Sequence, residues 1–161
     1  MYGLNYKIFW IIRSIIYKIL FLNIDMPSYI GKPIFLVGFK RIKIGSEFRL
    51  FPGARIEVKK NGFLKINNNV SIAQNVHITC GKKITIDDGV CIAPNVCITD
   101  TVHTFYDLKK NILQQKDTFK KTLIGKNTFI GFGSIIDAGS IIGKNVVIGA
   151  NCYVRGHVKD Y

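Results

Sequence analysis

Acidic residues are scarce in this sequence, and their scarcity sets its charge. The 161 residues include 10 Asp and Glu against 23 Lys and Arg, which gives a formal net charge of +13 and a pI near 9.7. Such an excess predicts a polyanionic partner, which could be nucleic acid, an anionic membrane surface or a phosphorylated cofactor. The sequence has no zinc-finger spacing, no RNP-like aromatic motif and no recognition helix, so we expect no nucleic-acid partner.

Cysteine is also sparse, and no two cysteines form a C-x-x-C pair. Such a pair would point to a zinc site or a redox centre. The first 22 residues contain no small-residue cleavage site of the kind that follows a secretory signal. We therefore expect reduced, structural thiols in a cytosolic protein. The four cysteines are Cys80, Cys91, Cys97 and Cys152.

A long uninterrupted apolar run is missing from the N-terminal segment. Lys7, Arg13 and Lys18 interrupt it, whereas a membrane-spanning helix needs about 20 apolar residues. At helical spacing, Lys7, Ser14 and Lys18 share one stripe. We expect an amphipathic helix within residues 1–24, which lies peripherally on the cytoplasmic face of the inner membrane or packs on the flank of the domain or on a neighbouring subunit. The opposite stripe consists of Ile8, Ile12, Ile15, Ile16 and Ile19.

The strongest pattern in the sequence is a repeat of six residues. The residue after each repeated aliphatic is often small or acidic, and the fifth position of each six is small or β-branched. A period of six fits neither alternating strands nor amphipathic helices, whose periods are 2 and 3.6. The repeated aliphatics are Ile66, Ile72, Ile78 and Ile84, then Ile86, Ile92 and Ile98, and finally Ile124, Ile130, Ile136, Ile142, Ile148 and Val154.

These hexapeptides predict an all-β fold, a left-handed parallel β-helix over residues 25–161. Each six forms a short strand and a bend, three sixes close a triangular turn, and successive turns cover each other's open edges. The aliphatic and the fifth residue point inward, and Gly or Asp accommodates the bend. The two-residue shifts at Leu64–Ile66 and Ile84–Ile86 indicate small bulges at corners.

The repeat stops at residues 104–123 and then resumes, which predicts one long protruding loop. Long ordered loops are usually functional. His103 stands where this loop leaves the repeats, and a neutral imidazole there could take a proton from a hydroxyl that attacks a thioester. Asp100 could orient the ring or contact the acceptor, or it could be a solvated aspartate at a bend.

The sequence resembles the hexapeptide-repeat acyltransferases, and among them the maltose/galactoside-type and surface-polysaccharide O-acetyltransferases. The resemblance covers residues 66–161. It rests on IAPNVCITDTVHTFYD, on Gln114 and Gln115 of the loop, and on the run IGKNTFIGFGSIIDAGSIIGKNVVIGANCYVRGHVKDY.

The resemblance implies an acetyl-CoA-dependent O-acetyltransferase of surface-polysaccharide synthesis, active as a homotrimer with clefts between subunits and without a metal. It places His103 at the position of the family's catalytic histidine. Members of the family usually continue past residue 161 into a tail that packs by the adenine of CoA. Either the sequence is shortened there or the affinity for CoA is reduced.

The resemblance also assigns binding residues. Gly131, Phe132 and Gly133 would offer backbone N–H groups to the thioester, Gly149 and Ala150 would flank the pantetheine arm, and Arg155 would lie near the cofactor. The candidates for binding the saccharide or glycolipid acceptor are Gln74, Phe105, Tyr106 and Asp107.

Three alternatives compete with O-acetylation. A γ-type carbonic anhydrase needs three histidines on zinc, but no H-x-x-x-x-H occurs among His77, His103 and His157, and we expect no metal. A non-catalytic scaffold that binds anionic lipid or glycan would have no need of the loop beside His103. An N-acetyltransferase acting on an amino sugar nucleotide remains the third possibility, although such relatives commonly carry a preceding nucleotide-binding domain.

Overall fold

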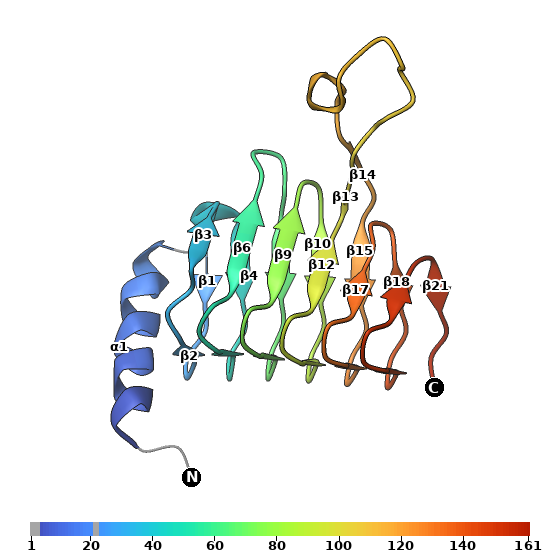
Figure 1. Cartoon of the computed structure of the whole chain (residues 1–161). Coiled ribbons are helices and arrows are strands. Elements are labelled where there is room, and N and C mark those ends of the chain that lie inside the picture. Colours follow the sequence, from blue (N-terminus) through green and yellow to red (C-terminus); the bar gives the residue numbers. More distant parts are fainter. Residues whose placement is uncertain (1–3, 21–22) are drawn as a thin grey trace.

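The chain folds into a parallel β-helix with one helix across its N-terminal end. The computed structural model describes residues 4–20 and 23–161. Helix α1 (Leu4–Leu20) lies across the first turn, and the chain then winds into stacked turns toward the C-terminus (Figure 1). The predicted parallel β-helix of hexapeptide repeats, with its N-terminal helix and its single long loop, is confirmed.

Three parallel sheets, here called A, B and C, form the faces of the prism. Sheet A contains β1 (Asn23–Ile24), β4 (Ile42–Ile44), β7 (Leu64–Ile66), β10 (Ile84–Ile86), β15 (Thr122–Ile124), β18 (Ile141–Ile142) and β21 (His157–Val158). Sheet B contains β2 (Tyr29–Ile30), β5 (Arg49–Leu50), β8 (Ser71–Ile72), β11 (Cys91–Ile92), β16 (Phe129–Ile130) and β19 (Val147–Ile148). Sheet C contains β3 (Phe35–Val37), β6 (Arg55–Val58), β9 (His77–Cys80), β12 (Cys97–Thr99), β17 (Ile135–Ile136) and β20 (Tyr153–Val154).

The core is a column of aliphatic side chains, one or two from each strand. Equivalent residues of successive turns lie in register, as Ile72 of β8, Ile92 of β11 and Ile130 of β16 do. The fifth residues of the hexapeptides also point inward, from Val70, Val76, Val90 and Val96 to Thr128, Ser134 and Ser140. Phe48 fills one of these positions and is fully buried, and the small Ala54 fills the next one.

Asparagine makes as many of the left-handed bends as glycine does, although the sequence assigned the bends to glycine or aspartate. Six asparagines, three residues after an aliphatic, have positive φ angles between 53° and 60°. Asn reaches this left-handed region more easily than other non-glycine residues. The glycine directly after an aliphatic has a different role, since a Cβ on Gly125 would lie 2.5 Å from the carbonyl oxygen of Gly143. The six are Asn69, Asn75, Asn95, Asn127, Asn145 and Asn151.

One boundary and two details of the repeat differ from those expected. The β-helix begins at Asn23 of β1, which pairs with β4, and not at residue 25. The shifts at Leu64–Ile66 and Ile84–Ile86 are not bulges but straight strands of sheet A, in which residues two apart both face the core. The extra residues are instead in the turns before them, at residues 59–63 and 81–83. Part of the predicted helix, residues 1–3 and 21–22, lies outside the described residues.

Candidate functional site

The long loop leaves the prism at the edge where sheet C passes into sheet A, here called the C–A edge. Its base is a short antiparallel hairpin of β13 (Thr101–Val102) and β14 (Thr118–Phe119), and the chain re-enters sheet A in β15. The loop is therefore shorter than the 104–123 expected from the sequence, because 118–119 and 122–123 are paired strands. It stands well clear of the prism (Figure 1).

Hydrogen bonds inside the loop hold its shape. The side-chain amide of Gln115 donates to the carbonyl oxygens of Asp107 and Lys110, and its oxygen accepts from the N–H of Asp107 at 3.1 Å. Gln114 closes the 3-10 turn at Ile112–Gln114 by accepting from the N–H of Asn111. Both glutamines of the family resemblance thus act on the fold of the loop itself.

Asp100 anchors the base of the loop and does not contact the His103 ring. Its buried carboxylate accepts hydrogen bonds from the N–H groups of Gly81, Lys82 and Lys83 at 2.6, 2.8 and 2.7 Å. Three N–H donors satisfy a buried carboxylate without any cationic partner. The expectation that Asp100 orients the ring is therefore wrong in this structure. Its carboxylate shapes the turn on which the loop rests.

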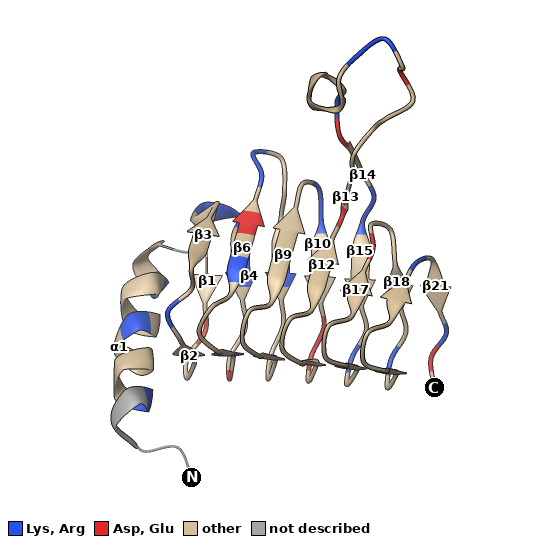
Figure 2. Cartoon of the chain, in the orientation of Figure 1, with Lys and Arg blue, Asp and Glu red and all other residues tan. Residues whose placement is uncertain are grey.

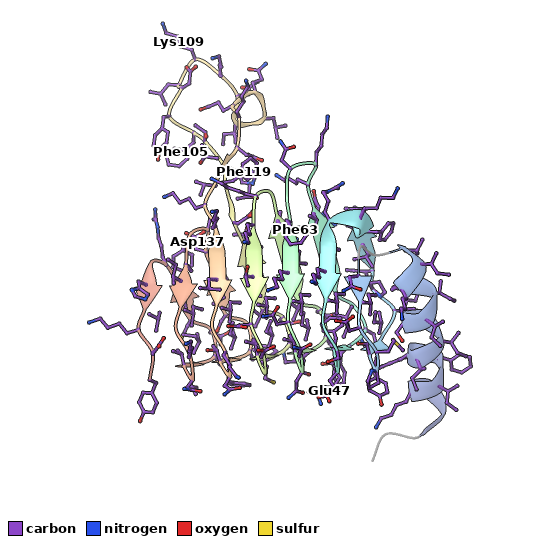
Figure 3. All side chains as sticks on the ribbon, turned by 180° about the vertical axis from the view of Figure 1, so that it is seen from behind. Glu47, Phe63, Phe105, Lys109, Phe119 and Asp137 are labelled. Atoms are coloured by element: carbon purple, nitrogen blue, oxygen red, sulfur yellow. The ribbon has the colours of Figure 1, made fainter. Side chains whose placement is uncertain are left out.

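Phe119 seats the returning strand of the loop on that same turn. A Cβ on Gly81 would lie 2.1 Å from the Phe119 ring, so only glycine leaves room for it. The Lys59 ammonium lies 5.6 Å from the centre of the Phe119 ring, within the range of a cation–π contact. In Figure 3, Phe119 lies at the base of the loop. The base is thus fixed by contacts to two earlier turns.

The ring of His103 is held by a carboxylate from the other side of the loop. Its Nδ1 lies 2.7 Å from Oδ1 of Asp117, whose Oδ2 lies 2.8 Å from Nζ of Lys59. The Lys59 hydrogen bond, and then that of His103, lowers the pKa of Asp117 below its ordinary value. Lys59, Asp117 and His103, here called the loop-base triad, bring together three separate parts of the chain.

This arrangement specifies which ring nitrogen can accept a proton. An ionised carboxylate only accepts hydrogen bonds, so Nδ1 of His103 carries the hydrogen and the lone pair of the neutral ring is on Nε2. The His103 side chain is 73 % exposed, whereas that of Asp117 is 24 % exposed. The basic nitrogen therefore faces the outside of the prism, where a hydroxyl or amine substrate can approach it.

Lysine and arginine follow the C–A edge from the first turn to the loop. Each of four successive turns places two cations there, and the colouring of Figure 2 shows them along the edge from which the loop rises. Arg41 donates to the carbonyl oxygens of Val58 and Lys59 and so also braces the next turn. The edge is a source of positive potential beside His103. Its members are Lys40, Arg41, Lys59, Lys60, Lys82, Lys83, Lys120 and Lys121.

Most of the predicted cofactor residues lie on a different edge, where sheet B passes into sheet C. Gln74, Phe132 and Ala150 follow one another along this B–C edge. The turns there are joined by backbone hydrogen bonds in which Asn95, Gly133 and Asn151 donate to the carbonyl oxygens of Gln74, Pro94 and Phe132, respectively. The N–H groups of Gly131 and Gly133 donate to Ile148 and Pro94, respectively. These two N–H groups are engaged in the β-helix itself, so they are not available to a thioester as expected. Gly149 and Ala150 are exposed in the last turn of sheet B.

Arg155 shares the C–A edge with His103, two turns farther along. Strand spacing of about 4.8 Å puts these turns roughly 10 Å apart along the axis. Its Nε lies 3.8 Å from Oδ2 of Asp137, which also accepts a hydrogen bond of 2.6 Å from the Tyr153 hydroxyl. That bond to Asp137 raises the pKa of Tyr153. Asp137 and Tyr153 are a polar pair that sequence reasoning missed.

The predicted acceptor residues of the loop are divided between surface and scaffold. Phe105 and Tyr106 are exposed, with ring centres 4.6 Å apart. Asp107 pairs with Lys110 at 2.9 Å and holds the loop through Gln115. Figure 3 shows Lys109 at the tip of the loop, with Phe105 lower on the loop, on the side of the body that carries Asp137. Gln74, on the B–C edge, is not brought near these residues.

The three histidines lie on separate parts of the prism. His77 points outward from β9 in sheet C, where its Nε2 is 3.1 Å from Nε of Arg55, and His157 lies in β21 of sheet A. Burial, and then Arg55, lowers the pKa of His77. Within residues 4–20 and 23–161, no group of three or more His, Cys, Asp or Glu side chains is arranged to hold a metal ion.

Lys59 and Asp117 are the functional candidates that the sequence did not reveal. Lys59 is 44 residues before His103 and belongs to an earlier turn, and Asp117 is one carboxylate in a loop rich in polar residues. Only the topology could have indicated Asp117. A loop that leaves and re-enters the prism at the same edge brings its second strand beside its first, and so places Asp117 next to His103.

Comparison with known proteins shows the fold. Residues 121–156 match the family model described as "Bacterial transferase hexapeptide (six repeats)". No curated protein sequence matches the chain.

Solved structures of AntD, an N-acyltransferase from Bacillus cereus, are similar over most of the chain. A mutant of AntD in complex with dTDP and coenzyme A has a TM-score of 0.80 at 21% identity, over 92% of this chain and 81% of that one. AntD with dTDP and 3-hydroxybutyryl-CoA has a TM-score of 0.73 at 20% identity, over 92% and 80%. A second mutant, with dTDP-4-amino-4,6-dideoxyglucose and coenzyme A, has a TM-score of 0.63 at 22% identity, over 92% and 81%. The chain therefore has the hexapeptide-repeat β-helix fold of these acyltransferases, with transferase-type hexapeptide repeats in residues 121–156.

Proposed function

We propose that this chain is an acyl-CoA-dependent acyltransferase that moves an acetyl group from acetyl-CoA to a hydroxyl of a sugar. The acceptor oxygen bonds to the thioester carbonyl carbon while Nε2 of His103 takes the hydroxyl proton. The C–S bond then breaks, and the imidazolium returns the proton to the departing thiolate of CoA. The products are the acetyl ester and free CoA, and the histidine ends as it began.

The observation that carries this proposal is the loop-base triad. A sugar hydroxyl is a poor nucleophile at neutral pH, so its proton must leave as the new C–O bond forms. His103 presents its basic nitrogen outward, and Asp117 fixes the ring and opposes the positive charge that develops on it. Lys59 in turn keeps Asp117 ionised. A surface histidine with no catalytic task would have no need of this support.

The charge of the C–A edge fits an acyl-CoA co-substrate. CoA carries phosphate groups, and the cations of this edge extend from the first turn of the prism to the base of the loop. The AntD structures bound CoA or 3-hydroxybutyryl-CoA on the same fold. Arg155, also on this edge, is the predicted cofactor residue that remains best placed to meet a phosphate.

A homotrimer would bring the two edges of the prism together. Within one chain, sheet C separates the B–C edge from His103 by roughly 15 Å, since its strands and bends span four to five residues at about 3.3 Å each. If Gly149, Ala150 and Phe132 act on the same cofactor as His103, they must come from the neighbouring chain. Each face of the last turns also exposes large apolar side chains suited to such a contact: Leu123 and Ile141, Phe129 and Val147, and Ile135 and Tyr153. Light scattering tests this assembly, and a monomer at micromolar concentration would exclude the shared cleft.

N-acylation of an amino sugar nucleotide is the second candidate, and the AntD likeness is the observation that favours it. A mutant of AntD was solved with dTDP-4-amino-4,6-dideoxyglucose. An amine that is already neutral needs a base less than a hydroxyl does, so the loop-base triad favours O-acylation.

One acceptor experiment separates these functions. The full chain is incubated with radiolabelled acetyl-CoA and three acceptor sets: membrane glycans, neutral sugars and dTDP-amino sugars. Label in an ester that mild alkali releases supports O-acylation, whereas alkali-stable label in the amino sugar supports N-acylation. No label in any set, with the protein folded, favours a binding scaffold.

A further inference from the structure

Helix α1 turns its apolar side away from the protein. The face toward the prism contains Trp10, Ser14 and Tyr17, and Ser14 is fully buried beside Met26. The helix packs against β1 and β2 through this face. The outward face is almost entirely large and apolar, with Ile19 the most exposed at 85 %. Its members are Ile8, Phe9, Ile12, Ile15, Ile16 and Ile19, here called the outer stripe.

The outer stripe lies at the N-terminal end of the prism, where it is accessible. The helix lies across the end of the prism, at right angles to the direction in which the turns stack (Figure 1). The outer stripe is therefore the end surface of the molecule, and a planar partner could meet it without touching the loop or the C–A edge near His103.

Cations surround this end of the molecule. Residues 1–50 include eight Lys or Arg and two Asp or Glu. Lys7 and Lys18 border the outer stripe on the helix itself, and Lys32, Lys40 and Lys43 are exposed in the first turns. Two copies that met face to face through the outer stripe would bring these like charges together, whereas an anionic surface would be attracted.

A pocket beside the helix has the matching chemistry. It has a volume of about 330 Å³ and is lined by Lys7, Trp10, Tyr29, Arg49 and Phe51. The rings of Trp10 and Phe51 meet edge to face at 5.5 Å. Two cations among three aromatic rings suit a phosphate group attached to an apolar body, and aromatic rings with polar tips are typical of membrane interfaces.

We infer that the α1 end of the chain docks on an anionic lipid bilayer, with the outer stripe inserted at the level of the headgroups and the pocket facing a lipid phosphate. Among the described residues, no helix is long and apolar enough to cross a membrane. The helix instead has the character of one that lies in the interface, with an apolar face bordered by lysines. Docking in this way would direct the β-helix axis away from the bilayer and carry the loop-base triad above it.

The test is sedimentation of the full-length protein with sucrose-loaded vesicles of phosphatidylcholine, with and without half phosphatidylglycerol. We expect binding to the anionic vesicles, weaker binding to the neutral ones, and a fall with rising salt. The variant Ile12→Glu/Ile19→Glu should lower the partition coefficient at least tenfold. The matched control is Leu108→Glu/Leu113→Glu, since these two leucines are 96 % and 98 % exposed on the distant loop, and it should bind as the native protein does.

Circular dichroism checks that each variant is folded. Light scattering on the same samples tests whether a second copy of the chain, and not a bilayer, covers the outer stripe. A native assembly that becomes smaller in Ile12→Glu/Ile19→Glu would show that a second copy covers the outer stripe, and would overturn the inference. Native protein that fails to sediment with anionic vesicles, or a helix variant that binds as well as the loop control, would overturn it too. Trp10 is the chain's single tryptophan, so its fluorescence reports docking at the pocket directly.

Discussion

Asp117→Asn removes one charge from the loop-base triad while keeping the shape of the side chain. The native carboxylate lies 2.7 Å from Nδ1 of His103 and 2.8 Å from Nζ of Lys59. An amide oxygen in its place still accepts a hydrogen bond from Nδ1. What is lost is the negative charge that opposes the imidazolium formed when the ring takes the acceptor's proton.

The size of the effect follows from the exposure of the pair. A hydrogen bond to a charged group contributes about 1.5–3 kcal/mol, but solvent screens an imidazole that is 73 % exposed. We therefore take about 1–1.5 kcal/mol, which corresponds to a five- to tenfold fall in kcat at roughly 1.4 kcal/mol per factor of ten. Loss of the whole ring should cost more, about 10²–10⁴-fold.

Steady-state kinetics on four proteins tests this reasoning: the native chain, Asp117→Asn, His103→Ala and the double variant. The KM for acetyl-CoA should change little, and the double variant should be no slower than His103→Ala alone, because Asp117 acts through the ring. Glu57→Gln is the matched control, since Glu57 also pairs with a cation and its side chain is 29 % exposed. A further loss in the double variant, or an equal loss in Glu57→Gln, would refute the positioning role.

Three further predictions concern the base of the loop and the thiols. Asp100→Ala should lower the free energy of unfolding by about 2–4 kcal/mol in urea titrations, because the buried N–H of Gly81 and the part-buried N–H groups of Lys82 and Lys83 lose their acceptor; an unchanged midpoint would contradict this. Gly81→Ala should displace Phe119 and lower kcat about 10- to 100-fold, with faster proteolysis of the loop and little change in the melting of the β-helix. Burial raises the pKa of Cys80 to about 12, so at mildly alkaline pH its thiol should resist alkylation until the protein unfolds, while the exposed Cys91 should react first.

The fold was accessible from the sequence because the β-helix is nearly one-dimensional. Each turn contacts only its neighbours, so a local period of six contains almost all the information. Ile124, Ile130 and Ile136 occupy the core positions that their spacing predicts. The asparagine bends were missed because Asn at positive φ looks like an ordinary polar residue when only the glycines of the repeat are considered.

The site was only partly accessible, because its parts belong to different turns. His103 could be singled out by its place beside the break in the repeat. Its partner could not, since Asp100 is nearer in sequence while Asp117 is nearer in space. The glycines of the B–C edge were recognisable as repeat positions, but the engagement of Gly131 and Gly133 N–H groups in the β-helix follows only from the stacking of turns.

The orientation of helix α1 was also not predictable from the sequence. The spacing of Ile8, Ile12 and Ile19 correctly grouped them on one side of a helix. It could not say whether that side faces the prism, because an apolar stripe usually does. In the structure Trp10 and Tyr17 take that place, and the isoleucines face outward.

The most direct measurement is acetyl transfer by the native protein, by His103→Ala and by His77→Ala, with acetyl-CoA affinity measured on the same samples by calorimetry. If His103 is the general base, kcat in His103→Ala falls by about 10²–10⁴-fold while acetyl-CoA affinity and assembly stay as in the native protein. His77→Ala, on the outer face of β9, should remain close to native turnover. Native turnover in His103→Ala, or its loss in a folded His77→Ala protein, would show that the reaction takes place elsewhere.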